Sequence, residues 1–247
     1  MGQKSCGGTM GGQIVMITGS AKGIGRACAE AFLQQGAKVS LISRTASEME
    51  STAKELLRMF PGKVSYFCGD VSSGEVVSKW FEKTRNDLGE PTSLVNNAAI
   101  FTNKKVQDQS LEDWEKVLRV NLTGSFLCAQ QFFKSPSPST VSRSIVNISS
   151  LAGIRGTEKF PGLSSYVASK FAIVGLTEAL AVEGKALGIR VNCIAPGAVD
   201  TEMLRQAIPS MRAKAVPSDI AKIAVFLCNE KESSVLTGST VEVFSNQ

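Results

Sequence analysis

The sequence predicts an α/β fold in which helices cover both faces of a doubly wound parallel sheet of about seven strands. Three observations support this prediction. Apolar runs rich in β-branched residues alternate with longer helical patterns along the chain. The runs are continuously apolar, which is typical of strands buried on both faces. A glycine-rich turn joins the first run to the first helical pattern, and such β-α-β alternation gives right-handed crossovers.

The expected strands are short and are bounded by polar or glycine-containing turns. They are Ile14–Thr18, Lys38–Ser43, Val64–Cys68, Ser93–Val95, Ser144–Ile148, Ile189–Ile194 and Thr240–Phe244. The expected helices are Ile24–Gln35, Ala46–Phe60, Ser73–Leu88, Leu111–Phe133, Leu163–Leu187 and Ser218–Cys228. Ser110, followed by Glu112 and Asp113, is a suitable start for the fourth helix.

The 247 residues suit one large domain, because no internal repeat and no linker divides the chain. We expect residues 14–247 to form that domain. Residues 1–13 are glycine-rich and polar and are predicted to be a flexible leader, without the apolar segment of a secretory signal. The Pro/Ser-rich segment 134–143 is expected to be an exposed loop before the fifth strand.

The composition argues against several classes of function. The net charge is +5, with no basic tract that also carries aromatic residues, so nucleic-acid binding is not expected. No uninterrupted apolar run reaches the roughly 18 residues of a membrane span. The six cysteines form no CxxC pair and the chain has no histidine. We therefore expect no metal site and reduced thiols in a cytoplasmic protein, and Ser-His-Asp hydrolysis is excluded.

Tyr166 and Lys170 stand four residues apart in Ser-Tyr-Val-Ala-Ser-Lys, within the predicted helix 163–187. Residues at i and i+4 share one face of a helix, so the lysine ammonium can lie close to the phenol. A nearby positive charge lowers the pKa of a tyrosine from its usual value of about 10. The pair therefore predicts a proton-transfer group that works near neutral pH without imidazole.

The turn Thr18-Gly19-Ser20-Ala21-Lys22-Gly23-Ile24-Gly25 lies between the first strand and the first helix. Glycines there allow a tight turn, a close backbone approach to a pyrophosphate and close packing of helix on strand. The start of the helix offers free N–H groups and a positive dipole end to phosphate. The spacing G-x-x-x-G-x-G predicts a dinucleotide site, with a plain strand-helix turn as the alternative.

Residue 44 bears on the choice of dinucleotide. An acidic residue after the second strand would bind the ribose hydroxyls of NAD(H), but Arg44 stands there instead. An arginine can bind a 2′-phosphate through two hydrogen bonds, and Lys22 in the glycine turn is expected to point to the same place. Two cations favour NADP(H) as the cofactor, with NAD(H) less favoured.

Further motifs follow in order: Asn96-Asn97-Ala98-Ala99, Asn121, Ile148-Ser149-Ser150, Tyr166 to Lys170, and Pro196-Gly197. Together with the glycine turn, this ordered set resembles the classical short-chain dehydrogenase/reductase family, from about Ile14 to near the C-terminus. The overall pattern is similar to that of the 3-oxoacyl-[acyl-carrier-protein] reductases. The resemblance implies a single Rossmann-type domain, assembled as a homotetramer or a homodimer.

The resemblance also implies roles for the matching residues. Tyr166 is the general acid/base, and Lys170 lowers its pKa and binds the nicotinamide ribose. Ser150 hydrogen-bonds the substrate oxygen, with Ser149 as the competing position. Asn121 positions a water in a proton relay. The implied cofactor-binding residues are Gly19, Ser20, Lys22, Gly23, Ile24, Gly25, Arg44, Asp70, Val71, Asn97, Ala98, Tyr166, Lys170, Pro196, Gly197 and Thr201.

The chain departs from the family pattern around the expected substrate site. Thr157-Glu158-Lys159 looks inserted between Ser150 and Tyr166, and the segment from Met203 to Pro217 is short for a substrate lid. The helix after Tyr166 also lacks the basic residue expected for docking an acidic carrier protein. Because of these departures, the sequence does not determine the shape of the rim of the site or the identity of the substrate.

The expected function is an NADP(H)-dependent oxidoreductase that interconverts a small-molecule carbonyl and a secondary alcohol, with a 3-oxoacyl thioester as the leading substrate. One alternative is an NAD(H)-dependent alcohol, polyol or steroid dehydrogenase of the same family. Another, from a different class, is a dinucleotide-binding redox sensor without turnover.

Overall fold

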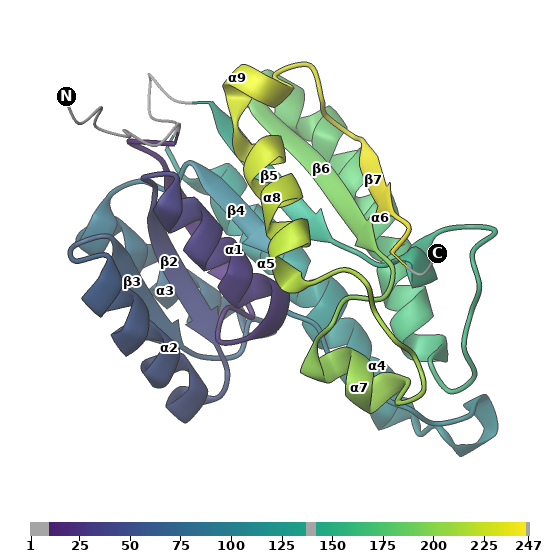
Figure 1. Ribbon diagram of the computed structural model, residues 1–247. Helices are drawn as coiled ribbons and strands as arrows, with labels where there is room; N and C mark the ends of the chain where they lie inside the picture. The colour runs from purple at the N-terminus through teal and green to yellow at the C-terminus, as the bar shows by residue number, and fades with distance from the viewer. Residues whose placement is uncertain (1–9, 137–141, 246–247) are drawn as a thin grey trace.

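A computed structural model describes residues 10–136 and 142–245, and Figure 1 shows a seven-stranded sheet between two layers of helices. The strand order is β3-β2-β1-β4-β5-β6-β7, and every neighbouring pair is parallel. The predicted fold class is therefore confirmed. Because the order reverses between β1 and β4, the chain leaves these two strands in opposite directions, and a crevice opens at their carboxyl ends.

The strands agree closely with those predicted from the sequence. They are β1 (Ile14–Thr18), β2 (Lys38–Ser43), β3 (Val64–Cys68), β4 (Ser93–Asn96), β5 (Arg143–Ile148), β6 (Ile189–Pro196) and β7 (Thr240–Val243). The largest difference is at β6, which extends past Ile194 to Pro196 and is buried along its whole length. A continuous apolar run marks a strand well when both of its faces are covered.

The long helices also agree with the prediction. They are α1 (Gly23–Gln34), α2 (Ala46–Met59), α3 (Gly74–Leu88), α4 (Leu111–Leu118), α5 (Gly124–Lys134), α6 (Ser164–Gly184) and α8 (Pro217–Cys228). Several shorter elements were not predicted: η1 (Val106–Asp108), η3 (Leu151–Gly153), α7 (Glu202–Ala207) and α9 (Glu230–Ser233). Another, η4 (Lys185–Leu187), lies within the predicted helix Leu163–Leu187. Elements this short show too little periodicity in the sequence to be recognised.

One predicted helix, Leu111–Phe133, is divided by a π-helical turn, η2 (Arg119–Thr123), between α4 and α5. A π turn contains one residue more per turn than an α-helix, so it changes which side chains face the protein interior. The polar side chain of Asn121 becomes buried at this turn. Such turns occur often at functional sites, and hydrophobic periodicity does not reveal them.

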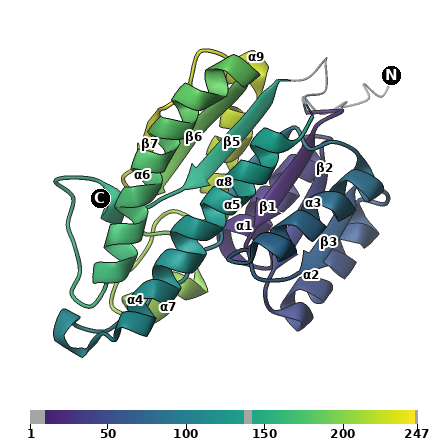
Figure 2. The same ribbon diagram turned by 180° about the vertical axis from the view of Figure 1, so that it is seen from behind.

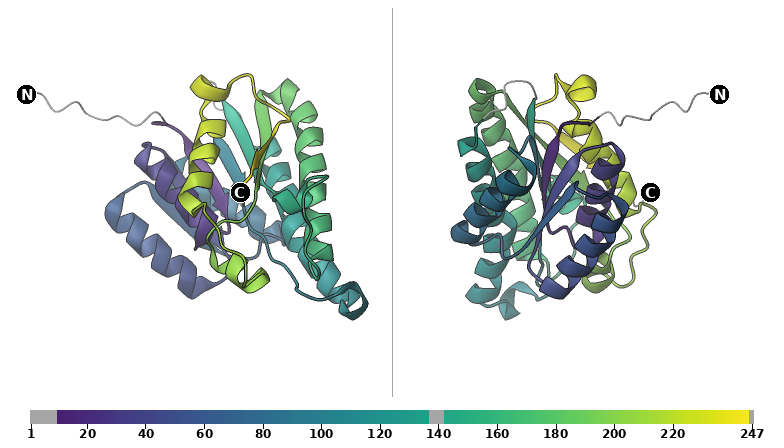
Figure 3. Two further views of the ribbon diagram at one scale, coloured as in Figure 1. Left: turned by 45° about the vertical axis from the view of Figure 1, so that its right-hand side comes forward. Right: turned by 90° about the vertical axis from the view of Figure 1, so that its left-hand side faces the viewer.

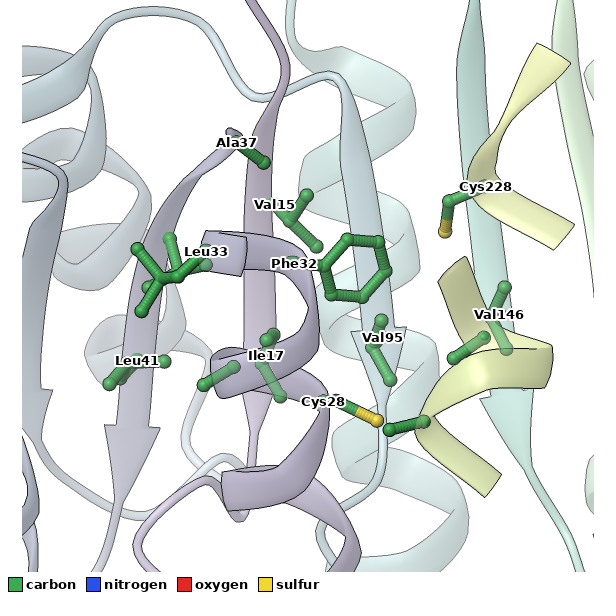
Figure 4. Packing of buried hydrophobic residues seen from close by; sticks show 14 of the residues in the cluster. Val15, Ile17, Cys28, Phe32, Leu33, Ala37, Leu41, Val95, Val146 and Cys228 are labelled. Atoms are coloured by element: carbon green, nitrogen blue, oxygen red, sulfur yellow. The ribbon is translucent and has the colours of Figure 1, made fainter. Parts of the chain in front are cut away.

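Helices α1, α2 and α8 cover one face of the sheet, and α3, α5 and α6 cover the other (Figures 1 and 2). Two further views show both layers side-on (Figure 3). On the first face, Phe32 and Cys28 of α1 pack beside Val15, Val95 and Cys228 (Figure 4). Burial of apolar side chains on both faces of the sheet provides the main stabilisation of the fold.

Part of the predicted leader packs against the fold. Met10, within the predicted leader 1–13, is buried, and its N–H donates to the carbonyl of Gln35. Residues 1–9 lie outside the described residues, as do residues 137–141, which are half of the predicted loop 134–143. Four of the cysteines are buried, as expected of core thiols, but Cys68 is exposed, and Cys6 lies outside the described residues.

Among the described residues, one helix has the length and mean hydropathy (1.3) of a membrane span, from Ser164 to Leu187. The sequence shows no uninterrupted apolar run there because Lys170 and Glu178 divide it. The helix α6 packs against the sheet, and both Lys170 and Thr177 are buried in the protein. It is a core helix by its packing.

Candidate active site

A large cavity of about 1220 Å³ opens at the carboxyl ends of the strands, where the strand order reverses. Most of the site residues predicted from the sequence line it: Gly19, Lys22, Gly23, Ile24, Arg44, Asp70, Val71, Asn97, Ala98, Ser150, Tyr166, Lys170, Pro196, Gly197 and Thr201. Ser20, Gly25 and Asn121 do not line it. The fold therefore brings together residues that lie up to 182 positions apart in the sequence, from Gly19 to Thr201.

The glycine turn is packed so closely that side chains are excluded at two positions. Gly19 has φ of +62°, and a Cβ there would lie 2.8 Å from the Cα of Ala98. A Cβ on Gly25 would lie 2.3 Å from the carbonyl oxygen of Gly19. Gly25 is thus needed below the cavity surface, where α1 meets the turn, rather than as a lining residue.

Ser20 has a structural place rather than a position on the cavity. It is fully buried, and its hydroxyl donates to the carbonyl of Ile42 at 3.2 Å. Its backbone N–H donates to the same carbonyl at 3.3 Å. Ser20 therefore fixes the turn to the end of β2, and the sequence-based expectation that it lines the cofactor site does not describe its side chain.

Asn97 and Thr18 tie the ends of β1 and β4 together. The Asn97 side-chain amide donates to the carbonyls of Thr18 and Gly19, at 3.0 Å each. The Thr18 hydroxyl accepts from the backbone N–H groups of Asn97 and Ala98, at 2.9 Å each. These bonds hold the floor of the cavity at the switch point and satisfy backbone groups that the diverging strands leave unpaired.

Loops at the other strand ends complete this part of the cavity. Asp70 accepts a hydrogen bond from the N–H of Ser72 at 2.9 Å, which forms the turn after β3. Val71 is buried against Gly124 of α5. Thr201 caps α7 by accepting from the N–H of Leu204 at 3.2 Å. Asp70 therefore both forms a turn and lines the cavity.

The two cations expected near a 2′-phosphate have different surroundings. Lys22 forms ion pairs with Glu48 of α2 at 3.1 Å and with Glu202 of α7 at 2.8 Å. Arg44 is exposed on the cavity, and within residues 10–136 and 142–245 its guanidinium forms no ion pair or side-chain hydrogen bond. Both cations line the same cavity, but the charge of Lys22 is already compensated.

Tyr166 lies in the first turn of α6, half-buried, with its hydroxyl beside the side chain of Ser150. The hydroxyl of Ser150 accepts from the N–H of Ala152 at 3.1 Å. Ser149, by contrast, is buried and donates to the carbonyl of Lys170 at 2.8 Å. Of the two serines, only Ser150 has its hydroxyl beside the phenol.

Lys170 is buried, and its Nζ lies 5.5 Å from the centroid of the Tyr166 ring. The ammonium donates to the carbonyl of Ile148 at 2.8 Å, which satisfies one of its protons. Burial lowers the pKa of Lys170 to about 8. The helical i, i+4 spacing thus places the two side chains as the sequence predicts.

The pKa of Tyr166 differs in direction from the prediction. Burial raises it, and the hydrogen bond with Ser150 offsets part of that rise. The expectation that Lys170 lowers this pKa assumes a strong field from a fully charged neighbour. Here the cost of placing a phenolate in a buried position is the larger effect, and burial also weakens the charged form of the lysine.

Asn121 is buried in η2 and does not reach the cavity. Its side chain accepts from the N–H of Ile100 at 2.8 Å and donates to the carbonyl of Ile100 at 2.9 Å. It also donates to the hydroxyl of Ser169 at 2.9 Å, and that hydroxyl donates to the carbonyl of Tyr166 at 2.7 Å. These contacts join the loop after β4 to the helix that carries Tyr166 and Lys170.

The sequence matches the short chain dehydrogenase family over residues 13–212. The chain belongs to the short-chain dehydrogenase/reductase family. A 3-oxoacyl-[acyl-carrier-protein] reductase, FabG, of Aquifex aeolicus is 33% identical over 243 residues, covering 94% of this chain and 96% of that protein. A 3beta-hydroxysteroid dehydrogenase of Mediterraneibacter gnavus is 33% identical over 229 residues, covering 92% and 80%.

A solved structure also resembles the fold of this short-chain dehydrogenase. It is described as a short-chain dehydrogenase/reductase, glucose/ribitol dehydrogenase, from Brucella melitensis, with a TM-score of 0.82 and 29% identity, covering 96% of both chains. The protein is thus an oxidoreductase of a family that uses a nicotinamide dinucleotide. Family membership alone gives neither the form of the dinucleotide nor the substrate.

The residues of this dehydrogenase fit such a cofactor. The glycine turn leaves room where side chains would collide, at Gly19 and Gly25. No described side chain caps the start of α1, so its first N–H groups and positive dipole end face the cavity. The buried ammonium of Lys170 adds a donor beside Tyr166.

The cavity has two parts, which we name from their residues. The glycine-turn end is formed by Gly19, Gly23, Arg44 and Asp70, and the loop end by Phe101, Phe160, Met203 and Ile208. Met203 and Ile208 belong to the segment 203–217 that was compared with a substrate lid, whereas Phe101 and Phe160 were not predicted as site residues. Both lie in long loops without a motif, so only the folded chain shows that they meet.

Thr157, Glu158 and Lys159, which look inserted when compared with the family pattern, lie near the loop end. Thr157 and Glu158 line the cavity. The ammonium of Lys159 donates to two carbonyls of its own loop, those of Ile154 and Thr157, at 2.8 Å and 2.9 Å. Hydrogen bonds within residues 154–159 therefore hold this side of the cavity.

Among the described residues no group of three or more His, Cys, Asp or Glu side chains forms a metal site.

Proposed function

We propose that the protein is an NADP(H)-dependent oxidoreductase that interconverts a carbonyl and a secondary alcohol, with 3-oxoacyl thioesters as the leading substrate class. The observation that carries the proposal is that Tyr166 and Ser150 line the cavity together with the buried ammonium of Lys170, whose Nζ lies 5.5 Å from the Tyr166 ring. The other end of the same cavity has the glycine turn, where the start of α1 offers N–H groups that suit a phosphate.

In the proposed reaction, a bound nicotinamide ring supplies or accepts the hydride. Tyr166 donates its proton to the carbonyl oxygen in reduction and accepts a proton in oxidation. Ser150 donates a hydrogen bond to the same oxygen as negative charge develops there. Lys170 binds the nicotinamide ribose and, while charged, favours loss of the tyrosine proton.

We propose a positioning role for Asn121. Its amide hydrogen-bonds Ile100 and Ser169, and Ser169 bonds the backbone of Tyr166, so it holds the first turn of α6 against the loop after β4. The water-positioning role implied by the family resemblance would be additional to these contacts.

The first experiment measures oxidation of NADPH against a panel of 3-oxoacyl thioesters, steroid ketones, sugars and small ketones. We expect Tyr166→Phe to lower kcat by about 10²–10⁴-fold, since it removes the acid while keeping the ring. Its affinity for NADPH should change little. Tyr66→Phe is the matched control, because Tyr66 is the other tyrosine of the chain and lies on β3 away from the cavity.

Each outcome of the panel has a definite meaning. Turnover by Tyr166→Phe within a few-fold of wild type would exclude this residue as the acid. Tight NADPH binding with no turnover of any compound by the wild type would favour the redox sensor. Turnover of steroids in preference to thioesters would support the alternative that the steroid dehydrogenase relative suggests.

The preference for NADP(H) rests chiefly on Arg44. It lies on the cavity after β2 with no ion-pair partner among the described residues, so a 2′-phosphate would be its first strong ligand. We expect Arg44→Ala to weaken NADPH binding by about tenfold and NADH binding by less than twofold. Fluorescence titration measures both affinities, and equal losses would contradict the preference.

We further propose that residues 14–247 fold as one domain and that the protein is a cytoplasmic homotetramer or homodimer. Phe126 of α5 and Phe171 of α6 are exposed (43% and 39%), as side chains at a subunit contact would be in an isolated chain. Light scattering would give the subunit number, and a monomer at micromolar concentration would contradict this proposal.

A further inference from the structure

Lys22 is the centre of an ion-pair cluster at the rim of the cavity. Its Nζ lies 3.1 Å from Oε1 of Glu48 and 2.8 Å from Oε2 of Glu202. The three side chains come from three elements: Lys22 precedes α1, Glu48 lies in the first turn of α2, and Glu202 begins α7. All three line the cavity on which Arg44 also lies.

The cluster carries a net charge of −1, because one ammonium is held by two carboxylates. The hydrogen bonds to Glu202 and Glu48 raise the pKa of Lys22, so the ammonium stays charged, but its field is compensated. A phosphate that approaches Lys22 must either displace the carboxylates or accept their repulsion. An unphosphorylated ribose carries no charge and meets neither cost.

We propose that Glu48 and Glu202 are specificity-determining residues that oppose binding of a 2′-phosphate by occupying Lys22. Arg44 then supplies most of the selectivity for NADP(H), and the two glutamates limit it. The inference rests on the proposed function only in that the cavity binds a nicotinamide dinucleotide. Because Glu202 begins α7, binding of the phosphate to Lys22 also removes the ion pair that joins this helix to the glycine turn.

The test is a fluorescence titration of NADPH and NADH at low ionic strength, where exposed charges are weakly screened. The variants are Glu48→Gln, Glu202→Gln and the double variant, since glutamine keeps the size of the side chain and removes its charge. We expect each single variant to tighten NADPH binding by about three- to tenfold and to change NADH binding by less than twofold. The gain should shrink at high salt.

A control variant and a double-mutant cycle test whether the effect of the glutamates depends on Lys22. Glu75→Gln removes a carboxylate that pairs with Lys79 on α3, outside the residues that line the cavity, and should change neither affinity. In a Lys22→Met background, the effect of Glu202→Gln should fall to less than half, because the ammonium it frees is gone. The glutamates are about half-exposed (side chains 42% and 51%), so the variants are expected to fold.

Equal changes in NADPH and NADH affinity for the glutamate variants would overturn the inference, as would the same effect from Glu75→Gln. An undiminished effect of Glu202→Gln in the Lys22→Met background would also overturn it, since the carboxylate would then act directly. If neither dinucleotide binds to any variant or to the wild type, both the inference and the proposed function fail. If both dinucleotides bind and the ratio of NADPH affinity to NADH affinity is the same in the glutamate variants as in the wild type, only the inference fails.

Discussion

At the glycine-turn end of the cavity a Cβ added to Gly25 would first meet backbone, whereas near the loop end a Cβ added to Gly162 would first meet a side chain. Gly25 sits where a Cβ would meet the carbonyl of Gly19 at 2.3 Å. Gly162 at the loop end sits where a Cβ would meet the side-chain oxygen of Asn103 at 2.4 Å. A backbone carbonyl in a tight turn cannot move aside, but an exposed amide side chain can rotate.

This difference suggests that the two ends of the cavity have different roles. The glycine-turn end is fixed by strand ends and by buried groups such as Ser20 and Asn97, so it offers one geometry. The loop end depends on contacts such as the hydrogen bond from Asn103 to the carbonyl of Ala207, at 3.2 Å, which joins the loop after β4 to α7. We expect changes at the first end to affect folding and dinucleotide binding, and changes at the second to affect the substrate.

Gly25→Ala should have the largest effect. The new Cβ collides with backbone, so we expect a loss of stability of about 1–3 kcal/mol and a loss of NADPH affinity of tenfold or more. Thermal unfolding and fluorescence titration measure the two effects. Gly175→Ala is the matched control: it lies in α6 with nothing within 4 Å of an added Cβ, and should be neutral or stabilising. Similar losses in both variants would contradict the close-packing explanation.

Lys170→Met tests the cost of the buried ammonium between the two ends. Its pKa of about 8 in the folded protein lies below the value of about 10.4 for an exposed lysine. Unfolding therefore takes up a proton between these pH values, and the free energy of unfolding rises with pH across that window. The full destabilisation is present below about pH 8. We expect the methionine variant to be more stable than wild type at pH 7, by about 1–3 kcal/mol.

The measurement is urea unfolding of both proteins at pH 7, 8.5 and 10. The stability difference between the variant and wild type should close as the pH approaches about 10.4. Lys231→Met, on an exposed residue of α9, is the control for the loss of one lysine charge at a surface position. A constant difference for Lys170→Met would show that the buried amine is not destabilising in the folded protein.

Gly162→Ala should have the smallest effect and one limited to the loop end. The collision would move the Asn103 side chain and weaken its bond to Ala207. We expect KM for the substrate found in the panel to rise by about two- to fivefold, with NADPH affinity unchanged. Gly156→Ala is matched in backbone conformation, with φ of +81° against +85°, but has open space at its Cβ. Equal changes in KM for the two variants would assign the effect to backbone strain alone.

Much of this protein was predictable because its signals are local. Continuously apolar runs predicted the strands, and the positions of Thr18–Gly25, Tyr166 and Lys170 followed from the turn and the helix that carry them. The loop-end residues Phe101 and Phe160 were not predictable, because loops have no periodicity that shows which way a side chain points. The π turn at Asn121 was missed for a related reason: one extra residue per turn leaves little trace in the sequence.

The sequence by itself determined where the strands lie along the chain, the glycine turn and the i, i+4 spacing of Tyr166 and Lys170, because each depends on neighbours along the chain. Only the tertiary structure decided the electrostatics. It paired Lys22 with Glu48 and Glu202, which are 26 and 180 residues away, and left Arg44 without an ion pair among the described residues. It also enclosed Tyr166 and Lys170, so that burial raises the pKa of Tyr166 and lowers that of Lys170. The i, i+4 spacing alone predicts a lowered pKa for Tyr166. Charge interactions and desolvation depend on distances through space, which spacing along a chain does not give.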